Sequence, residues 1–402
     1  MRFNIDNFVN AYVTKRSGSM FETDINSHNE ELFDMIEGKS VLVIGGAGSI
    51  GSSFVRAILP FKPSELYIAD TNENALTELT RDLRSSGSYV PPVYFPYPMD
   101  YNGGTFQRMF RKHHGFDIIA NFSAHKHVRS EKDIYSIEAL LRNNVINAKR
   151  LLDLLEDYKP SVYFCVSTDK AANPVNIMGA SKRIMEDLVF SYSTSFPVKT
   201  ARFANVAFSN GSLPAGFLER ISKLQPLSAP SDVKRYFVSP QESGQICMLA
   251  AMLGENRAIF FPKLKEAQME SFDRIAEELL TSYGYKIKYC GSDEDAIREA
   301  EKLRMGSQIY PVHFSKSDTS GEKAFEEFYV QGENVDWNRF VSLGVITDKQ
   351  APDKNTVIDL VTMFEKAFER ESVAKEDIVK MITEYLPNFE HIETGRSLDG
   401  KM

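Results

Sequence analysis

Residues 41 to 51 read VLVIGGAGSIG, and this stretch decides the fold. An apolar run typical of a buried strand leads directly into glycines at Gly45, Gly48 and Gly51, and the helical pattern SSFVRAIL follows. Glycines at this spacing allow a tight turn and a close approach of backbone N–H groups to a pyrophosphate, and the helix N-terminus favours negative charge. The stretch predicts a dinucleotide cradle that includes Ser49 and Ile50, with a ligand-free tight turn as the alternative.

Apolar runs of strand length continue outward from this motif, with helical patterns between them. Such alternation predicts an α/β Rossmann fold, a doubly wound parallel sheet covered on both faces. The further runs are ELYIAD at 65–70, VYFPY at 93–97, DIIANFSA at 117–124, VYFCVST at 162–168 and VKTARFANVAF at 198–208.

The rest of the chain divides around this core by its patterns. After about residue 210 the alternation loosens and prolines cluster, so we expect a smaller mixed substrate lobe with brief strands near 257–261 and 309–313. Helical extensions at both ends favour a homo-oligomer. The expected units are an N-terminal helical extension at 1–38, the Rossmann domain at 39–210, the lobe at 211–335 with a possible return to the Rossmann domain, and a helical tail at 336–402.

Composition excludes several classes of protein. The 402 residues carry a formal charge of −8, which gives no general attraction to nucleic acid or to an anionic membrane. The three cysteines are far apart, so neither a disulfide framework nor a metal site is expected. Neither a signal peptide nor a membrane-spanning run is visible, and the expectation is a cytoplasmic protein.

Two aspartates follow strands at the positions where a dinucleotide would lie. Asp70 ends the second apolar run, 25 positions after Gly45, where a carboxylate can accept both ribose hydroxyls. Thr71 and its neighbours supply no cation for a 2′-phosphate, so the predicted cofactor is NAD rather than NADP. Asp100, after the third run, is placed to meet the adenine. Ordinary turn or helix-capping roles are the alternatives for both aspartates.

Two motifs follow the fifth strand, STDK at residues 167–170 and MGASK at residues 178–182. Ligands of a doubly wound sheet bind at the carboxyl ends of its strands, so these side chains should face the nicotinamide. The alternative for the adjacent acid and base is a surface ion pair that caps a strand and has no catalytic role.

The segment STDKAANPVNIMGASKR closely resembles the signature of extended short-chain dehydrogenase/reductases that act as UDP-N-acetylglucosamine 4,6-dehydratases in bacterial polysaccharide and glycan biosynthesis. The likeness extends to AHKHV at 124–128, RFANV at 202–206, RYF at 235–237 and GEK at 321–323, so it covers roughly residues 38 to 330. Extended members usually have a catalytic Tyr four residues before the Lys. This sequence has Met178 there, which resembles the configuration-retaining branch, whereas the C5-inverting branch keeps the Tyr.

The resemblance implies a lyase reaction in which the sugar C4 hydroxyl is oxidised, water is lost across C5 and C6, and the hydride returns to C6. Because the thioether of Met178 cannot transfer protons, we expect Asp169 to take the C4 proton, relayed by Thr168, and later to protonate the leaving C6 hydroxyl. Lys170 would be the base that removes the C5 proton. Lys182 would bind the nicotinamide ribose.

A further set of polar and cationic side chains is expected to hold the nucleotide-sugar. A guanidinium matches two phosphate oxygens, which favours Arg235 for the pyrophosphate. Solvated loop positions are the alternative for Lys126 and, as the first turn of a surface helix, for Lys323. The expected set is Lys126, Asn205, Ser209, Asn210, Arg235 and Lys323.

Other functions share parts of this pattern. A nucleotide-sugar 4-epimerase or 4-reductase needs the same cradle, Asp70 and Lys182, but generally relies on the missing Tyr. A non-catalytic nucleotide-sugar sensor is the other class. The sequence does not distinguish a UDP-sugar from a GDP-sugar, and it does not name the pathway served.

Overall fold

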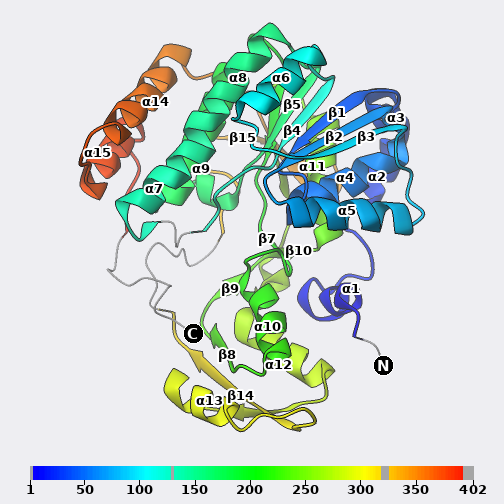
Figure 1. The fold of residues 1–402 in the computed structure, drawn as a ribbon, viewed down its shortest axis with the longest axis vertical. Coiled ribbons are helices and arrows are strands. Elements are labelled where there is room, and N and C mark those ends of the chain that lie inside the picture. The colour runs from blue at the N-terminus through cyan, green and yellow to red at the C-terminus, as the bar shows by residue number, and fades with distance from the viewer. Residues whose placement is uncertain (1–2, 128–130, 318–325, 393–402) are drawn as a thin grey trace.

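Strand β1 (Ser40–Ile44) lies inside a large, mostly parallel sheet (Figure 1). The computed structural model describes residues 3–127, 131–317 and 326–392. Within these residues nine strands form the main sheet, in the order β15-β16-β11-β6-β5-β4-β1-β2-β3. The other strands are β2 (Glu65–Asp70), β3 (Val93–Pro98), β4 (Ile118–Asn121), β5 (Val162–Val166), β6 (Val198–Ala201), β11 (Ile259–Pro262), β15 (Asn334–Asp336) and β16 (Leu343–Thr347).

The strand order reverses at β1, which pairs in parallel with β2 on one side and with β4 on the other. Residues of β1 from Val41 to Ile44 are almost fully buried, as expected for a strand covered on both faces. At such a reversal the loops after neighbouring strands diverge and open a crevice for a ligand. The predicted Rossmann fold class is confirmed.

Helices cover both faces of the sheet (Figure 1). Amphipathic patterns dictate this layering, because each helix buries one apolar stripe against the strands. One face carries α3 (Asn29–Ile36), α4 (Ser49–Ile58), α5 (Glu73–Ser85) and α11 (Pro240–Leu253). The other carries α6 (Gly104–Lys112), α7 (Ile134–Leu141), η4 (Arg142–Ile146), α8 (Asn147–Asp157), α9 (Ile177–Ser191), α14 (Lys354–Phe368) and α15 (Lys375–Tyr385).

A smaller lobe lies beyond the carboxyl ends of the strands (Figure 1). Its three-stranded sheet has the order β13-β14-β8, and short pairs β10-β7 and β12-β9 lie between this sheet and the main one. The lobe contains β7 (Asn205–Val206), α10 (Leu213–Ser222), β8 (Leu227–Pro230), β9 (Lys234–Arg235), β10 (Phe237–Val238), β12 (Glu270–Ser271), α12 (Phe272–Ser282), β13 (Lys286–Tyr289), α13 (Asp293–Ala300) and β14 (Ile309–Ser315).

The N-terminal extension joins the two parts. Its first turns, α1 (Ile5–Phe8) and η1 (Val9–Val13), bury apolar side chains in the core of the lobe, and α2 (Glu22–Ser27) leads into α3. Between them, Arg16 forms a 2.6 Å ion pair with the buried Glu242 of α11. The extension therefore adds to both cores at once.

Two parts of the chain after residue 210 join the main sheet: the first agrees with the possible return to the Rossmann domain, and the second differs from the expected helical tail. The strand expected in the lobe near residues 257–261 is β11, which pairs in parallel with β6 of the main sheet. The tail expected to be helical from residue 336 begins with β16, because its run LGVIT is short, apolar and partly β-branched, and it pairs antiparallel with β11. Periodicity alone does not tell which sheet a short strand joins.

Within residues 3–127, 131–317 and 326–392, no helix is both long enough and apolar enough to cross a membrane.

Helices α4 and α11 cross so closely that only glycine fits at Gly244. A Cβ there would lie 2.1 Å from the backbone oxygen of Ser53, a distance that no real Cβ adopts. We expect Gly244→Ala to lower the free energy of unfolding by about 1–3 kcal/mol, the usual cost of overpacking, as measured by urea denaturation.

Gly216 of α10 provides the matched control. A Cβ at Gly216 would meet only the flexible guanidinium of Arg220, at 3.2 Å. Gly216→Ala should therefore leave stability unchanged or raise it by up to about 1 kcal/mol. Equal effects of the two substitutions would contradict the close helix crossing.

Candidate active site

The glycine-rich turn between β1 and α4 has the shape of a phosphate cradle. Gly45 has φ +69°, and a Cβ there would lie 2.8 Å from the backbone nitrogen of Ser123. A Cβ at Gly51 would lie 2.3 Å from the oxygen of Gly45, so the helix can start this close to the strand only without a side chain. Gly48 caps α4 in extended conformation, which leaves the first N–H groups of the helix to face a ligand. The turn fits a dinucleotide.

Polar contacts fix the two sides of this cradle. The carboxylate of Asp70, at the end of β2, accepts from the backbone N–H of Ala47 at 3.0 Å and from that of Asn72 at 2.9 Å. Ser49 accepts from the backbone N–H of Asn210 at 2.8 Å, which ties the cradle to the loop after β7. Asp70 therefore lies beside the cradle, where the sequence places the ribose.

Asp100 is exposed after β3 and accepts from the backbone N–H of Asn102 at 2.9 Å. This contact is an ordinary turn of the kind that Asp favours. The adenine contact stays a prediction.

The acid and base of the STDK motif form a close cluster at the end of β5. The hydroxyl of Thr168 donates to Asp169 at 2.7 Å, and the ammonium of Lys170 lies 3.1 and 3.3 Å from the two carboxylate oxygens of Asp169. Asp169 is only 3% exposed, whereas the side chain of Lys170 is 32% exposed. A surface ion pair does not describe Asp169 and Lys170, because the carboxylate of Asp169 is buried.

Helix α9 brings the MGASK motif against this cluster. Gly179 packs on the backbone of the STDK run, where a Cβ would lie 2.7 Å from the oxygen of Lys170. Met178 is buried in the first turn. The ammonium of Lys182 is buried too and donates to the oxygen of Val166 at 2.7 Å, and burial lowers its pKa. The two motifs are therefore neighbours in space.

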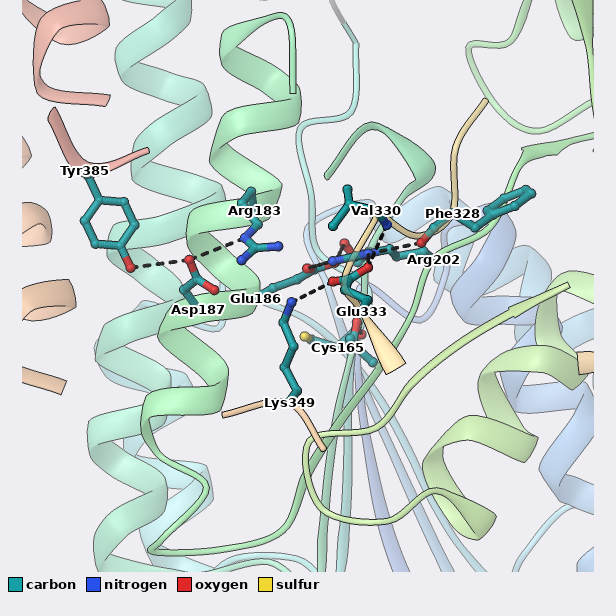
Figure 2. A network of polar contacts seen from close by, with 12 residues as sticks. Cys165, Arg183, Glu186, Asp187, Arg202, Phe328, Val330, Glu333, Lys349 and Tyr385 are labelled. Carbon is teal, nitrogen blue, oxygen red and sulfur yellow. Dashed lines mark hydrogen bonds and ion pairs between the residues drawn. The ribbon is translucent and has the colours of Figure 1, made fainter. Parts of the chain in front are cut away.

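A buried network of charges anchors the strand that carries the cluster (Figure 2). Ser167 donates to Glu186 of α9 at 2.6 Å, and Glu186 forms a 2.6 Å ion pair with Arg202, which is fully buried just after β6. Arg202 also contacts Glu333 at 3.2 Å, and Glu333 pairs with Lys349 at 2.6 Å. One network thus joins β5, α9, β6 and the returning C-terminal chain.

Glu326 is a carboxyl that the sequence analysis did not single out. It accepts from the side chain of Asn205 at 2.5 Å and from the backbone N–H of Tyr236 at 2.7 Å. Burial, followed by the negative charge of Asp169, raises the pKa of Glu326 to about 7, although the charge of Lys170 opposes the shift. A group that can hold a proton near neutral pH therefore lies beside Asp169 and Lys170.

The residues expected to contact the substrate lie on several separate elements. Asn205 is engaged with Glu326, and Ser209 is buried in the turn after β7. Arg235 is 8% exposed in β9 and donates to the oxygen of Lys234 at 2.9 Å. Lys126 is exposed beyond β4. Lys323 lies outside the described residues.

The sequence pattern does not identify two carboxylates near the site, Glu326 and Glu131, because their partners are distant in the chain. Glu326 follows GEKAF and Glu131 follows a loop, and both positions look like solvated surface in the sequence. Their contacts come from residues far away in the chain, such as Asn205, 121 positions from Glu326. Only their closeness to the quoted motifs GEK and AHKHV could have drawn attention to them.

A family model described as a polysaccharide biosynthesis protein matches residues 41–333. The chain belongs to this family. The match covers the cradle, the STDK and MGASK motifs and Glu326.

Several curated relatives align with most of the chain. An uncharacterized membrane protein of Methanocaldococcus jannaschii is 29% identical over 75% of this chain and 88% of its own length. The probable polysaccharide biosynthesis protein EpsC of Bacillus subtilis is 28% identical over 79% of this chain and 52% of its own. An inverting UDP-N-acetylglucosamine 4,6-dehydratase of Campylobacter jejuni is 24% identical over 73% and 83%. A UDP-glucose 4-epimerase of Rickettsia conorii is 26% identical over 74% and 89%. The chain thus spans about half the length of EpsC.

Solved structures with this fold include Pen from Bacillus thuringiensis, with TM-score 0.62, 19% identity and coverage of 82% of this chain and 98% of that one. The dTDP-glucose 4,6-dehydratase DesIV of Streptomyces venezuelae, solved with NAD, has TM-score 0.54 and 18% identity over 87% and 97%. The likeness establishes the fold, and the predicted cofactor is the one that DesIV holds.

The buried network predicts how stability depends on pH. Although burial raises the pKa of Glu186, the guanidinium of Arg202 lowers it to about 2, from an ordinary 4.5. A carboxylate with a depressed pKa stabilises the fold above its unfolded-state pKa and loses that contribution as the pH falls. Urea unfolding should show a loss of roughly 3 kcal/mol from this group between about pH 4.5 and 2.

Arg202→Met should remove this acid dependence and cost about 3–5 kcal/mol at pH 7, because Glu186 then stays buried without its partner. Arg298→Met is the control, since Arg298 forms an exposed ion pair with Asp295. The control should change stability by less than about 1 kcal/mol. An unchanged acid dependence in Arg202→Met would contradict this account.

Proposed function

We propose that this chain is an NAD-dependent nucleotide-sugar 4,6-dehydratase that converts UDP-N-acetylglucosamine to the 4-keto-6-deoxy sugar with retention at C5. One observation supports this proposal most directly. The buried carboxylate of Asp169 contacts both Thr168 and Lys170, while Met178 stands at the position of the usual phenol. Acid and base are adjacent, as elimination requires, whereas hydride transfer at C4 needs only one group that exchanges a proton with the C4 hydroxyl.

The residues of the cradle fit the cofactor. Gly45, Gly48 and Gly51 would hold the pyrophosphate, Asp70 the adenosine ribose and Lys182 the nicotinamide ribose. NAD, when bound, supplies the capacity to accept a hydride from C4 of the sugar and to return it to C6.

The side chains at the end of β5 would divide the proton transfers. Thr168 would receive the proton of the C4 hydroxyl and pass it to Asp169 over the 2.7 Å hydrogen bond. Lys170, whose side chain is 32% exposed and can give its ammonium proton to solvent, would act in its neutral form, take the C5 proton and later return it. Asp169 would protonate the departing C6 hydroxyl. The side chains that would share these roles, Thr168, Asp169 and Lys170, lie within hydrogen-bond distance of one another.

Retention at C5 is supported by Met178. A thioether cannot deliver a proton, so protonation of C5 from a second, phenolic side is not available at this position. Lys170 would remove and return the C5 proton on one face of the sugar ring. The Campylobacter relatives are named as inverting enzymes, so the proposed stereochemistry sets this chain apart from them.

A nucleotide-sugar 4-epimerase is the second candidate, because relatives with that name align over a similar length. Such an enzyme needs a base for the C4 hydroxyl but no acid for a leaving group. The adjacent Asp169 and Lys170 favour the dehydratase. A GDP-sugar substrate and a non-catalytic nucleotide-sugar sensor are tested by the same experiment.

Incubation with NAD and UDP-N-acetylglucosamine in heavy water should give a product that has lost one water and gained one deuterium at C5, with the C5 configuration retained. Mass spectrometry and NMR measure these changes. Asp169→Asn should lower the rate about a hundredfold to ten-thousandfold, the usual contribution of a general acid–base. Lys170→Met should still form the C4 ketone in a single turnover but should introduce no deuterium.

The control variants are Asp34→Asn and Lys286→Met, which make the same changes at exposed positions on α3 and β13. Both should keep the parent rate. A product of unchanged mass would indicate an epimerase, turnover of the GDP-sugar alone would correct the substrate, and absence of turnover with either sugar would refute the proposal. Deuterium uptake by Lys170→Met at the parent rate would remove Lys170 from the role of C5 base.

Glu326 predicts a pH dependence for the same reaction. Because its pKa is raised to about 7, Glu326 is neutral below that pH, whereas above it a second negative charge beside Asp169 would oppose the transfer of the proton from Asp169 to the departing C6 hydroxyl. We expect kcat to fall as pH rises through about 7, and we expect this ionisation to vanish in Glu326→Gln. Glu327→Gln is the matched control one residue along. A parent pH profile in Glu326→Gln would contradict this role.

A further inference from the structure

The C-terminal segment runs along the helix that carries Met178 and Lys182. Helices α14 and α15 lie beside α7, α8 and α9 (Figure 1), and apolar side chains such as Phe364 and Phe389 are buried in the same core as α9. Residues after 333 lie outside the part of the chain that the family model matches. This packing is therefore a feature of the chain beyond its family core.

The end of this segment contacts the loop before α9 and also Glu131, which lies against the first turn of that helix. The backbone N–H of Ile392 donates to the oxygen of Val175 at 3.0 Å. Nε2 of His391 lies 3.3 Å from Oε2 of Glu131, and the ammonium of Lys375 donates to the backbone oxygen of Glu131 at 3.2 Å. The side chains of Glu131 and His391 are 10% and 13% exposed. Two tail residues thus hold Glu131 from two sides.

Glu131 in turn caps the catalytic helix. Its other carboxylate oxygen, Oε1, accepts from the backbone N–H of Met178 at 3.0 Å, and the side chain of Asn176 accepts from Gly179 at 2.7 Å. The first N–H groups of a helix have no partner inside the helix, and negative charge at this end is favourable. Glu131 therefore satisfies one of these groups with a carboxylate that comes from outside the helix.

A second contact holds α9 further along its length. The hydroxyl of Tyr385 lies 3.4 Å from the carboxylate of Asp187, which also accepts from Arg183 at 3.4 Å (Figure 2). The tail thus contacts α9 directly at Asp187, and it contacts the chain just before α9 at Val175. Rotation or sliding of the helix would break one contact or the other.

We propose that Glu131 is a positioning residue for the catalytic helix and that the C-terminal segment, through His391 and Lys375, holds it in place. The position of Met178 depends directly on this cap. Gly179 follows at once and packs on the oxygen of Lys170, so a shift of the first turn of α9 moves the backbone of the STDK run. The kinetic part of this inference rests on the proposed dehydratase function, and the structural part does not.

Hydrogen exchange tests the structural part without any substrate. In Glu131→Ala and His391→Ala, the amides of residues 178 and 179 should exchange about tenfold faster, the effect of losing a helix cap. Glu131→Gln keeps an oxygen that accepts from Met178 and should restore most of the protection. Glu390→Ala is the matched control, because Glu390 is exposed beside His391 and should leave exchange unchanged.

Kinetics test the positioning role. We expect Glu131→Ala and His391→Ala to lower kcat roughly tenfold to a hundredfold, since a displacement of about 1 Å can have that effect, while KM changes little. Glu131→Gln should recover most of kcat, and thermal unfolding should show that all variants are folded.

The two proposals fail in different ways. If Glu131→Ala and His391→Ala exchange faster but the parent protein has no dehydratase activity, the proposed function is refuted and the helix cap is still supported. Parent exchange rates in Glu131→Ala and His391→Ala would overturn the cap, whatever the activity. Faster exchange with an unchanged kcat would overturn the positioning role, and a rise in KM alone would do the same.

Discussion

The ion pair between Glu186 and Arg202 is the constraint on which the site depends. Both side chains are buried, so neither charge can be solvated if the other moves away. Ser167 uses the same carboxylate as its acceptor, and the next residues of the chain are Thr168 and Asp169. The reactive run is therefore fixed at its base by a contact whose loss would be costly.

This arrangement separates rigid and adjustable parts of the site. Asp169 is buried close to the anchor, while the side chain of Lys170 is partly exposed and reaches back to it. Lys182 is held by a backbone carbonyl of the same strand, within the same rigid layer. The expected substrate contacts at Asn205 and Arg235 come instead from short strands between the main sheet and the smaller lobe. The residues proposed for the chemistry and those proposed for substrate recognition thus belong to different layers of the fold.

The sequence predicts the Rossmann core well because its signals are local. The glycine turn, Asp70 and the alternating apolar runs each need only their neighbours in the chain to be recognised. The structure also places the STDK and MGASK motifs side by side, as the rule on strand ends implies. Glu131, Glu326 and the place of β16 in the main sheet could not be found in this way, because the contacts of the two carboxylates and the pairing of β16 with β11 join residues more than 40 positions apart.

The order in which the sheet is completed has a consequence for synthesis of the chain. Strand β11 can pair with β16 only after about 80 further residues have been synthesised. The hydrogen bonds that the backbone N–H groups of Val341 and Ser342 donate to Asp24 also form only then. Until that point an apolar strand stands at the edge of a nearly finished sheet, and such an edge is prone to pair with another chain. A ribosome that stalls before residue 343 would therefore hold a nascent chain whose exposed edge a chaperone must cover.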